Sequence, residues 1–320
     1  MGASHRFKQD IDFVTSLIPD LYKAGIRNLA YEFYEHTHQA ILDSILTAKE
    51  WNERLLYHTI SSGFAIYWGY TEYLNLLKKV WEFNQTLEPN QPKFRVVLFG
   101  PEFNPCKEGE LMFVAGVNPD VTMAEVFKRE VISKQEKALI YTGTHHAFTR
   151  YREREKDDDC DDGYDDWWKG RMGNIIHQKY PEKTFTIMLH QPWVALGDWS
   201  KPMVRPVHGV IDSVMEMLSN RPMGFDVRGT IIGQLKADDT DYAACYEDFK
   251  LEDFTDGYIF LAPYRDIIFV LPEPNFYDEF NLKRFNAVNK CRNRPSVASK
   301  EEAMKRITEC PDAHFGHLRK

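Results

Sequence analysis

The sequence lacks the short motifs that mark several large enzyme classes. It contains no G-x-S-x-G nucleophile elbow, no P-loop, no G-x-G-x-x-G and no H-E-x-x-H. These absences count against a serine hydrolase, a nucleotide-binding protein and a zincin-type protease. The 5 cysteines form no CxxC pair, so the pattern predicts neither a zinc ribbon nor a disulfide framework. We therefore expect reduced thiols and a cytoplasmic protein.

Long apolar runs and an excess of positive charge are also missing. No run approaches the roughly 18 apolar residues of a membrane-spanning helix, and we see no signal peptide, so we expect no membrane span. The formal net charge of -8 argues against a nucleic-acid-binding protein that works through bulk positive charge. The oligomeric state stays open. Because the chain opens on Gly2 without a preceding strand, it also stays open whether Met1 is internal to a longer protein that begins with a targeting segment.

The sequence does contain short apolar segments that alternate with segments of helical periodicity. This alternation predicts an α/β fold whose mainly parallel sheet is flanked by helices. Pro19 lies inside the first helical segment and is expected to kink or shorten it. The expected strands are residues 26–33, 94–99, 137–141, 184–189 and 257–262, and the expected helices are residues 6–24, 36–51, 67–84, 121–134, 167–180 and 207–218.

Two regions are expected from the same pattern. Residues 1–270 form one α/β domain, with a helical insertion at about 35–90 after the second strand, and residues 271–320 form a peripheral tail with one helix at 299–310. The acidic run Asp157–Asp166 is expected to be a solvated loop. A calcium site is the alternative, but the run lacks the ligand order of an EF-hand.

A doubled G-x-x-H spelling, at Gly2–His5 and at Gly143–His146, is the candidate functional feature. His5 follows the first strand position, Glu32 ends the second strand and His146 follows a later one. If these strands are parallel neighbours, the three side chains meet at one edge of the sheet. Histidine and carboxylate groups that converge suit acid/base catalysis or a metal site. We therefore predict His5, Glu32 and His146 as catalytic residues, with Glu72 beside them, and the first three also as metal ligands.

Other polar side chains are candidates for substrate contact. His145 and His146 lie on what we expect to be an extended segment, so only one of them should face the site, and the spacing favours His146. The predicted substrate-binding residues are His145, Arg150, Ser4 and Trp68. His36 and His38 are an alternative ligand pair, and His190 is a weaker candidate.

At these residues the chain resembles the erythromycin esterase-like and ChaN/Tiki-like superfamily, whose fold is α/β. The resemblance runs through GASH, LAYEF with Glu32 and GTHH, and more weakly through Trp68 and Glu72 on one helix. Segments 95–102 and 172–189 extend it, in order, to about Tyr264. Two departures from the erythromycin esterase pattern are Ala3, where that family has an acidic residue, and the local sequence Gly-Thr-His-His, because the later histidine of that family usually follows His-Asn. The doubled G-x-x-H is closer to the Tiki/TraB arrangement.

The resemblance implies a hydrolase of an ester or amide bond in a small-molecule or peptide substrate. His5 or His146 would then be the general base, and Glu32 would orient a histidine or bind a divalent metal. The cofactor stays unknown. The alternative is a non-enzymatic binding protein for haem or another small ligand, as in ChaN-like relatives. A Tyr, His or Met near the pocket would then be the axial ligand, and Tyr141 and Tyr151 are the nearest tyrosines by sequence. A third possibility is a degenerate member with a structural or regulatory role.

Overall fold

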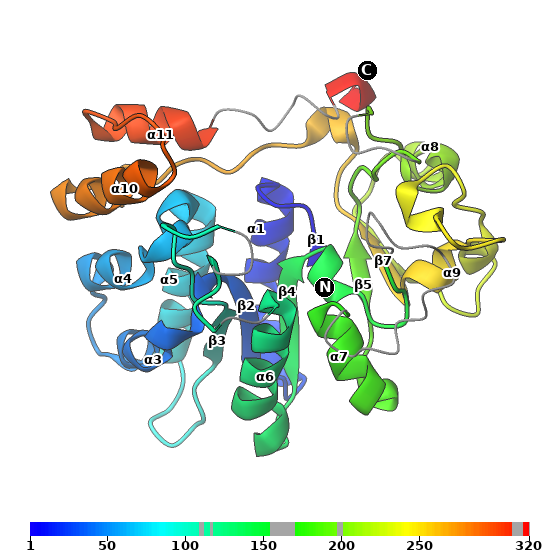
Figure 1. The fold of residues 1–320 in the computed structure, drawn as a ribbon. Helices are drawn as coiled ribbons and strands as arrows, with labels where there is room; N and C mark the ends of the chain where they lie inside the picture. Colours follow the sequence, from blue (N-terminus) through cyan, green and yellow to red (C-terminus); the bar gives the residue numbers. More distant parts are fainter. Residues whose placement is uncertain (109–111, 116–117, 154–169, 197–200, 309–315, 320) are drawn as a thin grey trace. The chain divides into compact units, whose positions relative to one another are not determined.

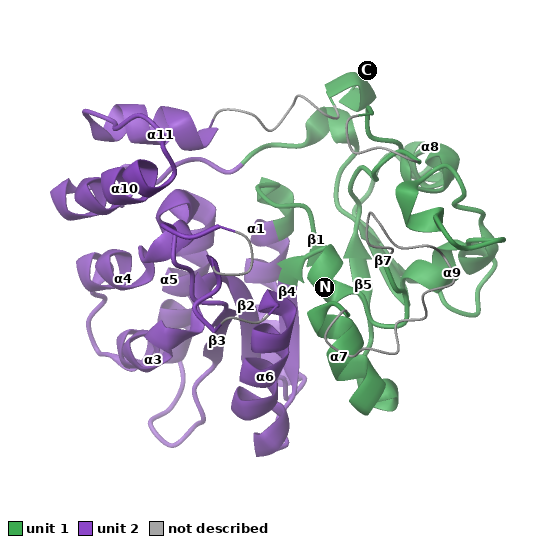
Figure 2. Cartoon of the chain, viewed as in Figure 1, with its two compact units in different colours: residues 1–10, 142–269, 310–320 green, residues 11–141, 270–309 purple. Residues whose placement is uncertain are grey.

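The computed structural model describes residues 1–108, 112–115, 118–153, 170–196, 201–308 and 316–319. The acidic run 157–166 therefore lies outside the described residues. The chain divides into two compact units, shown in Figure 2. Unit 1 comprises residues 1–10, 142–269 and 310–320, and unit 2 comprises residues 11–141 and 270–309. Residues 1–269 are thus divided between the two units, and residues 270–309 belong to unit 2.

Unit 2 is built around parallel strands whose residues are apolar on both faces. Strand β2 (Asn28–Glu35) pairs in parallel with β3 (Arg95–Gly100) on one side and with β4 (Ala138–Gly143) on the other. Seven of its eight residues are buried, which is typical of a parallel strand that is covered on both faces. These strands were expected from their short apolar runs, and the structure confirms them within two residues at either end.

The helices of unit 2 flank these strands (Figure 1). Helices α3 (Gln39–Thr47), α5 (Thr71–Gln85) and α6 (Pro119–Glu130) pack against β3. Pro19 has the expected effect, because helix α1 (Lys8–Ser16) ends before it and α2 (Ile18–Lys23) starts with the proline in its first turn. The remaining helices described in unit 2 are the 3₁₀ helices η1 (His36–His38), η2 (Gly63–Trp68) and η4 (Ile132–Lys134), and helices α4 (Glu53–Ile60), α10 (Glu279–Cys291) and α11 (Lys300–Thr308).

Unit 1 contains the end of β4 and four further strands. Strand β1 (Gly2–Ala3) pairs in parallel with β4 and with β5 (Ile187–Leu189), and β5 pairs in parallel with β7 (Gly257–Phe260). Strand β6 (Met223–Asp226) is the antiparallel edge strand. Because β4 takes part in both sets of pairings, the hydrogen-bonded order is β3-β2-β4-β1-β5-β7-β6. This confirms an α/β fold with a mainly parallel sheet.

The helices of unit 1 are short and cover a core rich in aromatic residues. They are α7 (Met172–Lys179), α8 (Val210–Met217) and α9 (Leu251–Phe254). The core includes Met188, Trp193, Phe254 and Tyr258, all at most 2% exposed. Among the described residues, no helix combines the length and the apolar character that crossing a membrane requires.

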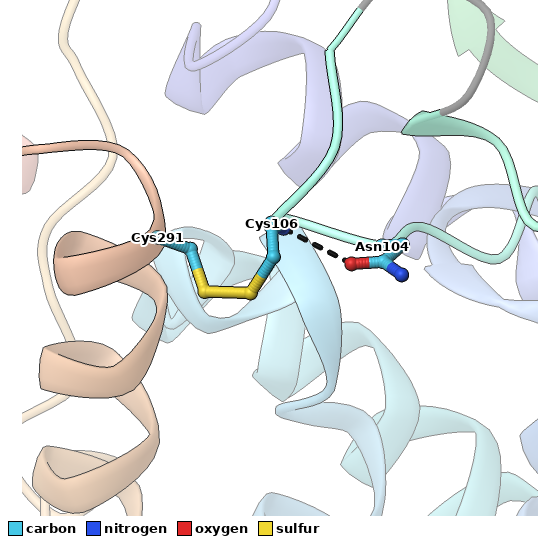
Figure 3. Close-up of a disulfide and its surroundings, with 3 residues drawn as sticks. All are labelled: Asn104, Cys106 and Cys291. Atoms are coloured by element: carbon cyan, nitrogen blue, oxygen red, sulfur yellow. Dashed lines mark hydrogen bonds between the residues drawn. A yellow bond between two sulfur atoms is a disulfide. The ribbon is translucent and has the colours of Figure 1, made fainter.

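The expectation of reduced thiols is wrong for three of the described cysteines, because Cys106, Cys291 and Cys245 are all disulfide-bonded. In unit 2, Cys106 and Cys291 form a disulfide, with their Cα atoms 4.5 Å apart and a sequence separation of 185 positions (Figure 3). A disulfide between cysteines so far apart in the sequence cannot be predicted from a local motif. The disulfide also removes the basis of the cytoplasmic expectation, because disulfides are rare in reducing compartments.

Candidate active site

A pocket of about 460 Å³ in unit 1 gathers several of the predicted residues. It lies where the turns that follow β1 and β4 meet. His5, His145, His146 and Ser4 all line it. The other lining residues are Ala3, Gly143, Thr144, Arg171, Gln191, Pro192, Val194, Met203 and Tyr242. The two G-x-x-H segments are thus brought together, as expected for neighbouring parallel strands.

Close packing and hydrogen bonds hold the two turns together. Gly2 pairs with Thr142, and a Cβ on Gly2 would lie 2.7 Å from the sulfur of Met188, so only glycine fits there without a shift. The backbone N–H and the hydroxyl of Thr144 both donate to the carbonyl of Ala3, at 3.2 and 3.1 Å. The side-chain amide of Gln191 donates to the same hydroxyl. The histidines therefore project from a well-fixed base.

Both adjacent histidines line the pocket, which differs from the expectation that only one would. The segment is not extended, because His145–Ala147 forms a 3₁₀ turn, η5, directly after β4. Successive side chains on a 3₁₀ helix are about 120° apart rather than on opposite faces. One pocket can therefore receive both imidazoles.

His145 has a carboxylate partner that the sequence analysis did not identify. Its Nδ1 lies 2.8 and 2.9 Å from the two carboxylate oxygens of Glu153. Arg171 donates to the same carboxylate from Nε at 3.0 Å and from Nη2 at 2.6 Å. Because Nδ1 faces an acceptor, it carries the ring proton, and this assigns Nε2 as the basic nitrogen.

The charge of Glu153 is maintained by these two partners. Burial alone would raise the pKa of Glu153, but the hydrogen bonds and charges of His145 and Arg171 outweigh it and lower the pKa. The loop that leads to Glu153 is fixed by Asn174 of α7, whose amide donates to the carbonyls of Thr149 and Tyr151, both at 2.7 Å.

The pocket also contains a phenol close to the basic nitrogen. The hydroxyl of Tyr242 lies 3.4 Å from Nε2 of His145. Burial, followed by the charge of Glu153, raises the pKa of Tyr242, so that the phenol stays protonated at neutral pH. The pocket therefore presents a base, an oriented carboxylate behind it and a neutral hydroxyl donor.

The remaining predicted residues lie outside this pocket. Arg150, in unit 1, makes an ion pair with Asp256 at 2.7 Å. Glu32, Glu72 and Trp68 belong to unit 2. Glu72 is buried and accepts the backbone N–H of Leu271 at 3.0 Å, and Trp68 packs against aromatic rings. Arg150, Glu72 and Trp68 therefore contact residues other than those that line the pocket.

The predicted metal ligands and the two tyrosines named for haem are not arranged as cofactor ligands in the described part of the chain. Within the described ranges, no group of three or more His, Cys, Asp or Glu side chains could hold a metal ion. Tyr141 and Tyr151, the tyrosines suggested for haem, are at most 2% exposed, and the hydroxyl of Tyr151 donates to the carbonyl of Tyr242. We assign no chemical step to either cofactor.

Comparison with known proteins assigns no family. No family model matches the chain, and no curated protein matches it. The structure of the type III effector HopBA1 is similar to this chain at a TM-score of 0.37 and 14% sequence identity, over 64% of this chain and 79% of that one. A similarity at this level carries no argument about fold or function.

Proposed function

We propose that the protein is a hydrolase that cleaves an ester or amide bond at the unit 1 pocket, with His145 as general base. The observation that carries the proposal is the His145–Glu153 pair, because a histidine whose Nδ1 faces a carboxylate is oriented to take a proton at Nε2. The pocket that His145 lines gives a small substrate access to that nitrogen.

In this reaction, Nε2 of His145 removes a proton from water as the water oxygen bonds to the carbonyl carbon. Glu153 stabilises the imidazolium that forms, and the proton then passes to the leaving oxygen or nitrogen as its bond to carbon breaks. The guanidinium of Arg171 and the hydroxyl of Tyr242 line the same pocket and can stabilise the negative charge that develops on the carbonyl oxygen.

The proposal departs from the first set of candidates in its choice of base. His5 and His146 become substrate-positioning residues, and Glu153 takes the orienting role that the sequence analysis gave to Glu32. A small-molecule or peptide substrate, and the interpretation of α3–α5 as an insertion into an erythromycin esterase/ChaN-like domain, remain parts of the proposal. Haem binding has no specific observation in its favour.

Turnover of a panel of nitrophenyl esters and short peptide amides tests the proposal. His145→Ala is expected to lower kcat/KM by about 10²–10⁴, the range typical of a lost general base. His177→Ala is the matched control, because His177 lies in the same unit, bonds to the hydroxyl of Thr184 and is not a pocket residue. Equal turnover in the parent and His145→Ala, or no turnover by the parent, would overturn the proposal.

A further inference from the structure

A second arrangement of catalytic residue types lies entirely in unit 2. Glu35 ends β2, His38 ends η1, and Ser62 is the residue that precedes η2. The hydroxyl oxygen of Ser62 lies 2.6 Å from a carboxyl oxygen of Glu35 and 2.7 Å from Nε2 of His38. The same carboxyl oxygen is 3.7 Å from Nε2 of His38. A serine oxygen in short contact with an imidazole is the geometry of a nucleophile and its base.

The backbone fixes this geometry at a tight turn. Gly63, directly after Ser62, has a positive φ of 49°. In addition, a side chain on Gly63 would collide with Oε1 of Glu35. Position 63 therefore requires glycine for two reasons, the positive backbone angle and the close approach of the carboxyl group.

Proton counting limits what Ser62 can do. The hydroxyl of Ser62 has one proton to donate, but it contacts two groups. Both groups can only accept a hydrogen bond when Glu35 is ionised and Nε2 of His38 carries no proton. One neighbour must therefore carry a proton: either Nε2–H of His38 donates to Ser62 and Ser62 donates to the carboxylate of Glu35, or Glu35 itself is protonated. If Glu35 carries it, the carboxyl group donates to Ser62, and Ser62 donates to His38. This state is the one in which His38 can remove the serine proton.

The surroundings favour this neutral state. Burial raises the pKa of Glu35, and the Ser62 hydroxyl, the N–H of Phe103 and the Arg284 charge only partly offset it, with Glu102 raising it further. Burial also lowers the pKa of His38; Arg284 and His36 add to that shift, and Glu102 opposes it. Each group is thus shifted toward its uncharged form.

The neighbouring serine shows what a purely structural hydroxyl looks like. Ser61 is 1% exposed, donates to the side chain of Asn281 at 2.7 Å and accepts from Arg284 at 2.7 Å. Ser62 is only partly buried and contacts two titratable groups instead. The two adjacent residues therefore differ in access and in partners.

We propose that Ser62 is a nucleophile, with His38 as its base, that reacts with acyl or phosphoryl electrophiles. Its oxygen bonds to the carbonyl carbon or phosphorus as the bond to the leaving group breaks, and its proton moves to Nε2 of His38 and then to the leaving group. Glu35 contacts the serine rather than Nδ1, so the arrangement is a Ser–His dyad with a carboxyl group beside the serine. This inference stands on unit 2 alone and does not depend on the proposed function.

Labelling of the full chain with diisopropyl fluorophosphate tests the inference. The Ser62 oxygen replaces fluoride on phosphorus, and the peptide that carries the added group is identified by mass spectrometry. We expect the label on Ser62 and not on Ser61. Removing the base in His38→Ala is expected to slow labelling by about 10²–10⁴. His38→Gln, which keeps a hydrogen-bonding side chain but not the base, should be equally slow.

Alanine variants of the two adjacent serines show which hydroxyl reacts with the label. Ser61→Ala removes the adjacent hydroxyl and should label at the parent rate, whereas Ser62→Ala should not label at this peptide. Circular dichroism of each variant separates a loss of reactivity from a loss of fold, and labelling of His38→Gln decides the case if His38→Ala does not fold. An unlabelled Ser62 in the folded parent, or equal rates in the parent and the folded His38 variants, would overturn the inference.

Discussion

The glutamates of the two histidine sites have pKa values that are shifted in opposite directions. In unit 1, Glu153 faces His145 and Arg171, and its pKa is lowered. In unit 2, Glu35 faces a hydroxyl and an N–H, and burial raises its pKa, while the charge of Glu102 adds to this shift and that of Arg284 opposes it. Both carboxyl groups are largely buried, so burial alone does not set the state. The difference comes from whether a cation bonds directly to the carboxylate.

This difference assigns each glutamate a different task. An ionised Glu153 accepts from Nδ1 of His145 and can stabilise an imidazolium. A neutral Glu35 can donate to Ser62 and direct the serine proton toward His38. A buried glutamate beside a histidine is therefore not by itself a sign of one mechanism, and variants that change each site separately can test the contrast.

The largest expected effect comes from removing the disulfide, which acts on unit 2. Cys106 lies shortly after Phe103, whose N–H donates to Glu35. Cys291 is the last residue of α10, and two side chains of that helix, Asn281 and Arg284, form hydrogen bonds with Ser61. The double variant Cys106→Ser/Cys291→Ser is expected to lose about 4 kcal/mol of unfolding free energy, because closing a long loop restricts the unfolded chain. Urea unfolding of parent and variant under non-reducing conditions measures it.

The double cysteine variant can also be used to compare the sites of the two units. Because both cysteines lie in unit 2, the rate of fluorophosphate labelling at Ser62 should change. The pH profile of turnover that depends on His145 should keep its shape. Unfolding midpoints that coincide for parent and variant would contradict a stabilising role for the disulfide.

Glu153→Gln is expected to have the next largest effect. The carboxylate receives hydrogen bonds from two cationic or proton-bearing partners, and bonds of this kind contribute about 1.5–3 kcal/mol. Because the folded pKa lies below the ordinary 4.5, the contribution of Glu153 is present above that pH and is lost as the pH falls through the folded pKa. The variant should therefore be about 2 kcal/mol less stable than the parent at pH 7, with a gap that shrinks in acid. A gap that widens in acid would contradict the assignment.

The fold was predictable because it depends on local patterns. The apolar run at 138–141 predicts a buried strand from local sequence alone, and the structure places β4 there. The proline at 19 likewise predicts a helix break, and α1 ends and α2 begins next to it. Strand β6 was missed because its residues MGFD show no alternation and are mostly exposed. Helix α10 was missed because polar residues dominate it, although Phe285 and Val288 are buried.

The site was predictable only in part, because its partners come from distant segments. The G-x-x-H repeat was visible, so His5, His145, His146 and Ser4 were found. Glu153 reaches His145 through a loop that no spacing rule describes, and Gln191 and Tyr242 come from far along the chain. Ser62 lies in a Ser-Ser-Gly stretch that the sequence alone presents as a linker. The contacts of Ser62 with His38 and Glu35 join residues whose spacing matches no known sequence motif.

The smallest effect is expected from Glu35→Gln, the same substitution at the other carboxyl group. A folded pKa above 4.5 means that the contribution of Glu35 is fully present below that pH and is lost as the pH rises through the folded pKa. Glutamine resembles the neutral carboxyl group: its oxygen can accept the N–H of Phe103, and its amide can donate to Ser62. Stability at pH 8 should therefore stay within about 1 kcal/mol of the parent or exceed it. Urea unfolding at pH 5 and pH 8 measures the difference. A loss at pH 8 as large as that of Glu153→Gln would mean that Glu35 is ionised in the folded protein, and the contrast between the two sites would then be wrong.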